Sequence, residues 1–353
     1  MKTDWISEIR RDCLIASDVQ IDVRSKLSLQ HISITGGTGF LGTWLAEMVA
    51  ALNDEYHLGI SLDLYARNIS DWCKKNTHLS KRSDITVRSQ DVRSQFNFER
   101  HTNFIVHAAG IPNNRVQSSD PLRVHQTTIQ GLKHSLDAAA QLDNLMRFLN
   151  VSSGLVSGQP MREGALKEGD YFSTPCGQLH NVYSEAKRSA EGLATIYRSQ
   201  FRMPISTVRP FTFVGPYQEL DRPWAFNNFL KDFLTGSDVR IHGDGNAVRS
   251  YMYGSDAAWW VIAALVNGSD GETYNLRENV GISNPSPAKD GSIGLRCHDV
   301  LQVEAASRNH NSDHGQNQGE FVGNQLTARS KCTHQRILIG RSPTSHQNAD
   351  DRE

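Results

Sequence analysis

The stretch Ile32-Ser33-Ile34-Thr35-Gly36-Gly37-Thr38-Gly39-Phe40-Leu41-Gly42 decides the fold, because short alternating apolar residues lead directly into a cluster of glycines. Apolar residues then recur at helical spacing as far as Leu52, so the pattern predicts a strand, a tight turn and a helix N-terminus. The spacing Gly36-x-x-Gly39-x-x-Gly42 lets the backbone turn sharply and bring its N–H groups close to a pyrophosphate. The helix N-terminus adds partial positive charge at the same place. We therefore predict a dinucleotide site, to which Phe40 and Leu41 of the first helical turn also contribute.

The composition places the chain among globular proteins and limits its partners. Its 353 residues suffice for one large domain or two moderate ones, and the formal net charge of −1 gives no global field to attract nucleic acid or an anionic membrane. No apolar run approaches the roughly 20 residues needed to span a bilayer, and Met1 to Trp5 do not resemble an export signal. Five scattered cysteines without a C-x-x-C pair suggest neither a disulfide framework nor a zinc site. We expect a soluble cytoplasmic protein without metal, nucleic-acid or membrane partners.

Strand-like and helix-like stretches alternate after the glycine turn. Strands are expected at residues 60–66, 85–87, 104–110 and 147–151, and a helix at about 124–142. This alternation predicts an α/β fold, a Rossmann-type doubly wound parallel sheet with helices on both faces. Ligands of such a fold bind beyond the carboxyl ends of the strands.

Four parts of the chain are expected. Residues 1–30 form an N-terminal extension with one short amphipathic helix over an edge of the domain, and residues 31–210 form the NAD(P)-binding domain. Residues 211–283 follow as a smaller C-terminal part, which the family resemblance described below implies to be part of a substrate lobe. Residues 284–353 are rich in Asn, Gln, Ser, His, Asp and Arg and cannot bury enough apolar surface to offset their ordering entropy. We expect this tail to be disordered or atypical.

Residues at the strand ends indicate the cofactor. Arg67 follows the second expected strand, where the adenosine ribose of a dinucleotide lies. An arginine there tolerates the extra phosphate of NADP, so Arg67 favours NADP; the alternative is a solvated strand-end residue. Asp63 lies early in the strand for a ribose ligand. The small residues Ala108 and Ala109 end the fourth strand and let a flat cofactor lie against the backbone, so the predicted cofactor is NAD(P).

Tyr183, Lys187 and Ser153 form the predicted catalytic set. Tyr183 and Lys187 are four residues apart and therefore share one face of a helix. A phenol is a poor base at neutral pH, but a neighbouring ammonium and a positive nicotinamide ring would bring its pKa towards the working range. Ser153 ends a strand that points at the same crevice and can hydrogen-bond a substrate hydroxyl or carbonyl. The three groups suit hydride transfer coupled to proton transfer at a secondary alcohol.

With these motifs in place, the chain resembles an extended short-chain dehydrogenase/reductase of the NAD-dependent epimerase/dehydratase family, which acts on nucleotide sugars. The resemblance covers roughly residues 28–280, and its motifs occur in family order. The matching pieces are Thr35 to Gly42, Asp91-Val92, His107-Ala108-Ala109, Ser152 to Gly158, Tyr183 to Lys187, Arg209 to Pro216 and Gly243 to Tyr251.

The resemblance implies a role for each matching residue. Tyr183 is implied as the catalytic base, Lys187 as the group that holds the nicotinamide ribose and lowers the tyrosine pKa, and Ser153 as the hydroxyl that orients the sugar. Further residues are implied as ligands: Asp91 and Val92 at the adenine, Arg249 on the nucleotide diphosphate, and Thr212 and Asn228 on the substrate. A guanidinium fork suits phosphate oxygens, whereas the alternative for Arg249 is a surface salt bridge.

Departures from the family pattern argue against two of the family's reactions, dehydration and decarboxylation. Sugar 4,6-dehydratases of the family carry an Asp-Glu pair directly after the catalytic Ser or Thr, and decarboxylating relatives keep the glutamate. This chain has Gly154-Leu155 there, and neither side chain can donate or accept a proton. Thr212 stands where asparagine is frequent, Ser157 replaces a usual tyrosine, and Thr128 replaces an asparagine, so the sugar stays open.

Three functions remain in competition. The first is a nucleotide-sugar epimerase, in which Tyr183 removes the hydroxyl proton, hydride passes to the cofactor, and the keto intermediate is reduced again from its other face. The second is a nucleotide 4-ketosugar reductase that uses exchangeable NADPH, which Arg67 would suit. The third is a catalytically impaired dinucleotide-binding paralogue, and the unusual tail favours this alternative. The family also implies a homodimer that packs the helices near residues 124–142 and 183–200.

Overall fold

The computed structural model describes most of the dinucleotide-binding region and part of the second lobe. The described residues are 5–20, 22–158, 166–175, 177–235, 237, 248–277 and 282–283. The prediction of a disordered or atypical tail at 284–353 falls outside them. Among the described residues, none of the helices is long and apolar enough to cross a membrane.

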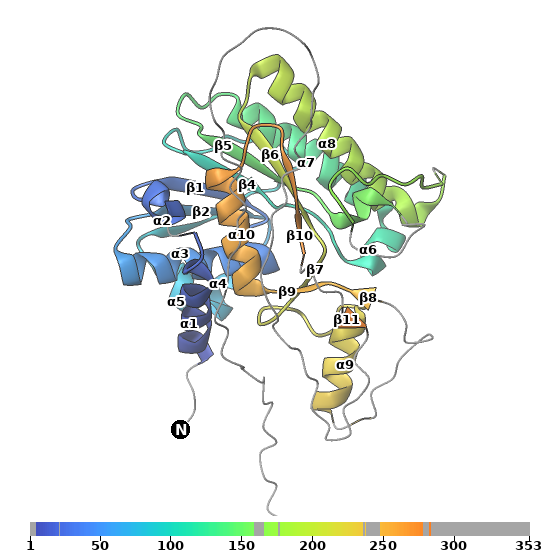
Figure 1. The fold of residues 1–353 in the computed structure, drawn as a ribbon, viewed down its shortest axis with the longest axis horizontal. Coiled ribbons are helices and arrows are strands. Elements are labelled where there is room, and N and C mark those ends of the chain that lie inside the picture. Colours follow the sequence, from blue (N-terminus) through green and yellow to red (C-terminus); the bar gives the residue numbers. More distant parts are fainter. Residues whose placement is uncertain are drawn as a thin grey trace, which may run out of the picture.

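A seven-stranded parallel sheet forms the centre of the molecule (Figure 1). Its strands, in spatial order, are β10 (Thr273–Leu276), β6 (Ile205–Pro210), β5 (Arg147–Val151), β4 (Phe104–His107), β1 (His31–Thr35), β2 (Ser61–Ala66) and β3 (Ile85–Ser89). The chain runs outward from β1 to β3, then crosses back to β4 beside β1 and continues to the other edge. This order confirms the predicted doubly wound α/β sheet. It places the topological switch point at the carboxyl ends of β1 and β4, where ligands of such folds bind in a crevice.

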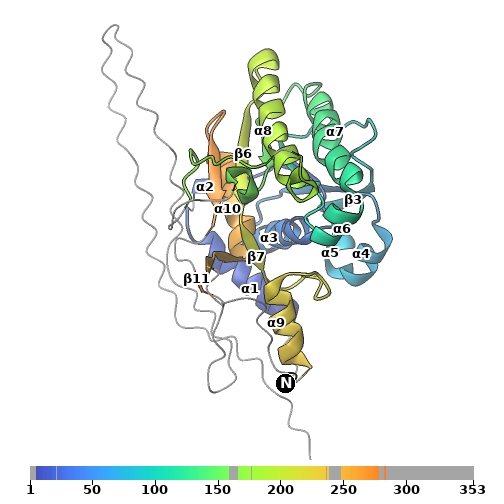
Figure 2. The same ribbon diagram turned by 90° about the vertical axis from the view of Figure 1, so that its right-hand side faces the viewer.

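Helices cover both faces of this sheet (Figure 2). One face carries α1 (Trp5–Ser17), α2 (Asp22–Leu27), α3 (Phe40–Tyr56) and α10 (Gly254–Asn267), which share one buried apolar cluster with the sheet. The opposite face carries α7 (Pro121–Ala139) and α8 (Val182–Phe201), which pack on each other and on a second cluster. Shorter helices join these layers: α4 (Ser70–Lys75), α5 (Thr77–Ser80), α6 (Asn114–Ser119) and the 3-10 turns η1 (Gly154–Ser157) and η2 (Leu179–Asn181).

Two boundaries differ from the sequence expectation for a physical reason. The helix expected near 124 begins at Pro121, because the Asp120 side chain accepts a hydrogen bond from the Arg123 N–H and proline suits the first helical turn. The N-terminal extension forms two helices where one was expected, and α1 packs against α3 and α10.

The second lobe lies below the sheet in Figure 1, at the end reached by β7 and β9. Strand β7 (Thr212–Val214) pairs in parallel with β9 (Tyr251–Tyr253), β8 (Val248–Arg249) pairs antiparallel with β11 (Ile282–Ser283), and α9 (Ala225–Leu234) lies between. Residues 254–276 form α10 and β10 and return to the Rossmann sheet.

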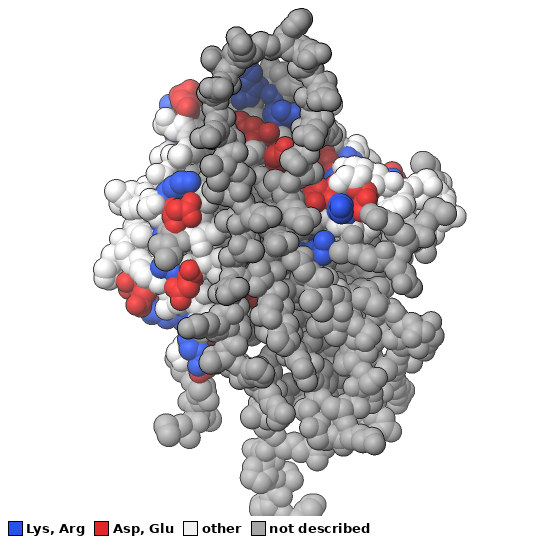
Figure 3. Space-filling model, in the orientation of Figure 1, with Lys and Arg blue, Asp and Glu red and all other residues white. Residues whose placement is uncertain are grey.

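The described surface carries mixed charge. On the face shown in Figure 3, blue and red side chains alternate over the described residues. This pattern agrees with the formal net charge of −1.

Candidate active site

The glycine turn joins β1 to α3 and touches the end of β4. Gly36 has φ +72°, and a Cβ there would lie 2.8 Å from the carbonyl group of Ala108. A Cβ on Gly42 would collide with the backbone of Gly37. An L side chain at either position would therefore displace backbone, which explains why the turn needs glycine.

The first turn of α3 presents donors to the crevice. The helix begins at Phe40, and its N-cap Gly39 makes no side-chain capping hydrogen bond. The first N–H groups of a helix have no partner within the helix, and they carry partial positive charge. The narrow glycine cradle and these donors fit the pyrophosphate of a dinucleotide, whose oxygens could approach the backbone where side chains would obstruct them.

The side chains at the tips of β2 and β3 lie where the adenosine half of a dinucleotide would bind. Arg67 is exposed immediately after β2, and its positive charge helps to lower the pKa of Asp91. The larger cause is Arg93, whose guanidinium holds the Asp91 carboxylate at 2.6 Å. Val92 is buried against Gly131 of α7. The structure therefore brings Arg67 and Asp91 together at one edge of the crevice.

Asp63 has a different environment from these residues. It is buried within β2, and Arg88 Nε donates to its carboxylate at 2.9 Å. His31 Nε2 lies 3.4 Å from the same oxygen, Oδ2. These contacts give Asp63 a structural role inside the sheet, in agreement with its early place in the strand.

Ser153 and Tyr183 meet at the carboxyl edge of the sheet. Ser153 follows β5 and caps η1, where its Oγ accepts the Leu155 N–H at 3.2 Å. Tyr183 lies in the first turn of α8, and both side chains are buried. A hydrogen bond from Ser153 lowers the pKa of Tyr183, but burial raises it more, to about 12. The sequence predicted this pair, and the structure brings it together.

Lys187 lies one helical turn after Tyr183 and points to the same strand end. Its ammonium donates to the carbonyl oxygen of Val151 at 2.7 Å, and burial lowers its pKa to about 8. The pKa of Tyr183 is nevertheless raised and not lowered in the protein alone. The physical reason is that burial disfavours the phenolate more than the groups around it stabilise that charge.

Two further buried polar residues were named in the sequence analysis only as parts of motifs, without a role of their own. His107 ends β4, its Nδ1 lies 2.8 Å from Thr35 Oγ1, and burial together with Lys187 lowers its pKa to about 3. His107 is therefore neutral at pH 7 and links the ends of β1 and β4. Arg209 of β6 is buried and pairs with Glu191 of α8 at 2.7 Å. The position of Glu191, one helical turn after Lys187, was the available signal.

Gly154 packs directly against an aromatic ring. A Cβ at Gly154 would lie 2.9 Å from the ring of Phe211, which follows β6. Leu155 is largely exposed beside Ser153. The two positions that carry acids in the dehydratases are therefore a packed glycine and an exposed aliphatic side chain.

The predicted substrate ligands Thr212, Asn228 and Arg249 belong to the elements of the second lobe. Thr212 is partly buried at the start of β7, and Asn228 is exposed on α9. Its neighbour Asn227 is fully buried; its Nδ2 donates to the Glu219 carbonyl at 2.7 Å, and its Oδ1 has no hydrogen-bond partner within the described part of the chain. Arg249 belongs to β8, where only the backbone is described.

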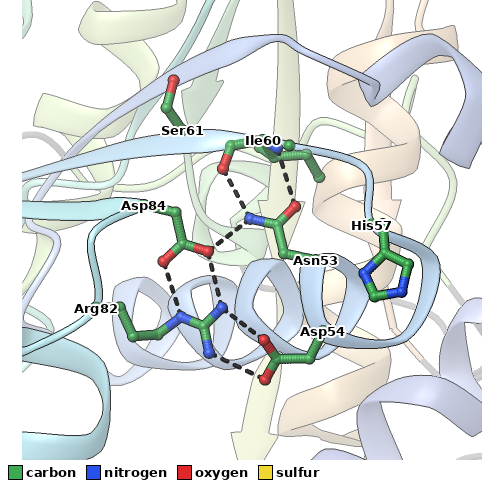
Figure 4. A pocket seen from close by; sticks show the side chains of 8 residues that line it. Asn53, Asp54, His57, Ile60, Ser61, Arg82 and Asp84 are labelled. Carbon is green, nitrogen blue, oxygen red and sulfur yellow. Dashed lines mark hydrogen bonds and ion pairs between the residues drawn. The ribbon is translucent and has the colours of Figure 1, made fainter.

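A separate polar depression lies at the amino end of β2 (Figure 4). It has a volume of about 390 Å³ and is lined in part by Asn53, His57 and Ser61. Figure 4 shows that the Arg82 guanidinium is held between the carboxylates of Asp54 and Asp84. Both carboxylates and the guanidinium are thus paired, and the depression is remote from the carboxyl ends of the strands.

A doubly wound sheet, a glycine turn after β1, and a serine, tyrosine and lysine at the carboxyl ends of the strands are typical of short-chain dehydrogenases/reductases. This chain is an extended member of that class. Residues 32–276 match the model of the NAD dependent epimerase/dehydratase family. The chain therefore belongs to that family, which confirms the resemblance and, at the level of the family, the predicted nicotinamide cofactor.

Individual relatives show how broad this family is. A low-salt glycan biosynthesis protein of Haloferax volcanii is 26% identical over 264 residues, which cover 72% of this chain and 78% of that protein. UDP-glucuronic acid decarboxylase 1 of Arabidopsis thaliana is 28% identical over 248 residues, 70% of this chain but only 54% of the decarboxylase. A solved UDP-glucuronic acid 4-epimerase of Bacillus cereus, in complex with UDP-glucuronic acid and NAD, superposes with a TM-score of 0.60 at 24% identity, over 72% of this chain and 80% of that one. Relatives with different reactions thus share the fold.

Proposed function

We propose that the chain is an NAD-dependent nucleotide-sugar epimerase in which Tyr183 is the acid/base and Ser153 orients the reacting sugar hydroxyl. The observation that carries the proposal is the buried Ser153–Tyr183 pair, together with the absence of an acidic side chain at Gly154 and Leu155, which follow Ser153 in the sequence. Epimerisation at a secondary alcohol needs one proton-transferring group and a hydride acceptor, and this pair supplies the former. A relative of the same fold binds UDP-glucuronic acid and NAD, which supports the proposed substrate class.

Loss of water or carbon dioxide fits the site less well. Those reactions in the family depend on acidic side chains directly after the catalytic serine or threonine. Here the Phe211 ring occupies the space beside Gly154, and Leu155 has no titratable group. An epimerase requires no proton transfer at these positions.

Other residues would bind the cofactor and orient the sugar. NAD, when bound, supplies the site with a hydride acceptor that can return the hydride. The glycine turn and the first turn of α3 would hold its pyrophosphate, and Ala108 and Ala109 would face its flat ring system. Lys187 would turn its ammonium from Val151 toward the nicotinamide ribose, and the positive ring would stabilise the Tyr183 phenolate. Ser153 Oγ would hold the sugar oxygen against Tyr183.

The second lobe would hold the nucleotide. We assign Thr212 and Asn228 to the sugar side and Arg249 to the diphosphate, because β7 and β8 carry two of these residues to the end of the sheet where Ser153 lies. A guanidinium matches phosphate geometry bidentately.

A second candidate is an NADPH-dependent 4-ketosugar reductase. The observation in its favour is Arg67, which is exposed at the tip of β2 and close enough to Asp91 to affect its pKa. A guanidinium there could accept the extra phosphate of NADP.

Mass spectrometry separates these functions. The full chain is purified, denatured and analysed for released NAD(H), and the native protein is incubated with UDP-glucose, UDP-glucuronic acid and UDP-N-acetylglucosamine. An epimerase retains NAD(H) and gives a product of unchanged mass and a new retention time. A gain of two hydrogens on a 4-ketosugar with NADPH identifies the reductase. Loss of water or carbon dioxide, or the absence of turnover with every sugar, contradicts the proposal.

A further inference from the structure

Two chain crossings between the lobes lie next to each other. The outward crossing follows β7 and contains Gly215, Pro216 and Tyr217, and the return crossing leads from Tyr253 at the end of β9 into α10. Gly215 has φ +135°, and a Cβ there would lie 3.0 Å from the ring of Tyr253. The orientation of the second lobe therefore depends on what holds these crossings.

The outward crossing is fastened to α3. Trp44 Nε1 donates to the carbonyl oxygen of Pro216 at 3.1 Å, and the Tyr217 hydroxyl donates to the carboxylate of Glu47. Glu47 is buried, with 4% of its surface exposed, and His78 Nε2 lies 2.6 Å from the same carboxylate oxygen. Tyr217 itself adopts φ +71°, a conformation that L residues rarely take, so its surroundings hold it in place.

The return crossing is fastened to α1. The Tyr253 hydroxyl donates to Asp12 Oδ2 at 3.1 Å. The Trp44 ring lies between the crossings: its centroid is 5.3 Å from that of Tyr253 and 5.8 Å from that of Tyr217. A Cβ on Gly254 would overlap the same indole. Burial and the adjacent carboxylates raise the pKa of both tyrosines, which therefore remain hydrogen-bond donors at neutral pH.

Helix α1 reaches both crossings from outside the family region. The family match begins at residue 32, after α1 has ended. Asp12 of α1 binds Tyr253, and the Trp5 ring lies edge-on to Tyr217 with centroids 5.7 Å apart. Figures 1 and 2 both place α1 and α9 toward the same end of the molecule.

We propose that α1 and Glu47 form a brace that fixes the second lobe over the dinucleotide crevice, through the bonds Asp12–Tyr253 and Glu47–Tyr217. Asp12, Glu47 and the two tyrosines are then positioning residues: they set where the nucleotide of the substrate lies relative to Ser153 and Tyr183. That consequence rests on the proposed function, whereas the brace itself does not.

Hydrogen exchange and ligand binding test the brace on the full chain. The variants are Tyr253→Phe, Asp12→Ala, their double variant, and Tyr217→Phe. The matched control is Tyr197→Phe, which removes another tyrosine-to-carboxylate bond, to Asp137, on the opposite face of the sheet. We expect faster amide exchange in residues 212–235 and 248–253 for the brace variants only, with exchange in β1, β4 and β5 unchanged.

Binding of UDP and NAD provides the second readout. Each brace variant is expected to bind UDP about fivefold more weakly, the effect of one net hydrogen bond, and to bind NAD as the wild type does. The double variant Tyr253→Phe/Asp12→Ala should bind UDP no more weakly than the single variant with the larger loss of UDP binding, because both changes remove the same hydrogen bond. Tyr217→Phe keeps the test informative if a change at Tyr253 prevents folding.

The outcomes separate the brace from the proposed function. Unchanged exchange at 212–235 in all brace variants, or equal acceleration in Tyr197→Phe, overturns the brace. If the wild type binds no UDP, the proposed substrate class fails while the exchange result still decides on the brace. Weaker NAD binding that parallels the loss of UDP binding shows general destabilisation and also overturns it.

Discussion

The ring of Phe211 lies 2.9 Å from the position that a Cβ on Gly154 would take. Phe211 follows β6 and Gly154 follows β5, which are neighbouring strands, so the contact lies beside Ser153. The consequence is steric as well as chemical: the position directly after Ser153 has neither a proton-transferring group nor room for one.

Gly154→Ala should therefore destabilise the protein. Overpacking of this kind costs about 1–3 kcal/mol in free energy of unfolding, and urea denaturation would measure it. Gly192→Ala is the matched control, because no atom lies within 4 Å of a Cβ built there. Since Gly192 lies within α8, its replacement should stabilise the helix by up to about 1 kcal/mol. The double variant Gly154→Ala/Phe211→Leu should recover part of the loss, and additive losses would argue against the contact.

Tyr183→Phe should strongly reduce turnover while leaving the cofactor site intact. The change removes only the hydroxyl that meets Ser153, and general acid–base groups of this kind contribute about 10²–10⁴-fold to the rate. Initial rates with the sugar identified by the mass-spectrometric screen would measure the loss, and NAD titration would serve as the control. A variant that retained most of its turnover would exclude Tyr183 as the acid/base.

Lys187 should make stability depend on pH in a defined window. Its folded pKa of about 8 lies below the ordinary lysine value of 10.5, so between these values the unfolded chain binds a proton that the native protein does not. Stability therefore rises with pH across this window. The rise is at most about 3 kcal/mol, at about 1.36 kcal/mol per pKa unit. Urea denaturation at pH 7.5 and above, compared with Lys187→Met, should show a rise that the variant lacks; parallel profiles would contradict the assignment.

The parts of the fold that were predictable depend on local rules. The positive φ at Gly36 follows from backbone sterics. Tyr183 and Lys187 share one helix face because they are four residues apart. The sequence is sufficient for both predictions. Tertiary packing decides the rest. Asn227 and Asn228 are neighbours on α9, and only the packing of that helix determines that the first is buried and the second exposed. The pKa of Tyr183 depends on burial, which no local pattern reports.

The buried pair Arg209–Glu191 gives the last prediction. Arg209 has 1% of its side chain exposed, and its guanidinium also donates to the Tyr171 hydroxyl and the Glu168 carbonyl. Glu191→Gln leaves this charge uncompensated, which costs about 3–5 kcal/mol for a buried pair. Asp270→Asn, which breaks the more exposed pair with Arg147, should cost no more than about 1 kcal/mol.

Glu191 also connects this pair to Lys187, because both residues belong to α8. Its negative charge raises the pKa of Lys187 and partly offsets the effect of burial. Glu191→Gln should therefore move the Lys187 pKa further down, and the pH window in which stability rises should begin at lower pH. Chemical denaturation over a pH series measures both effects in one variant. A loss of stability without a shift of the window would show that Arg209 alone depends on Glu191, whereas a shift without a loss would show that the ion pair contributes little to the fold.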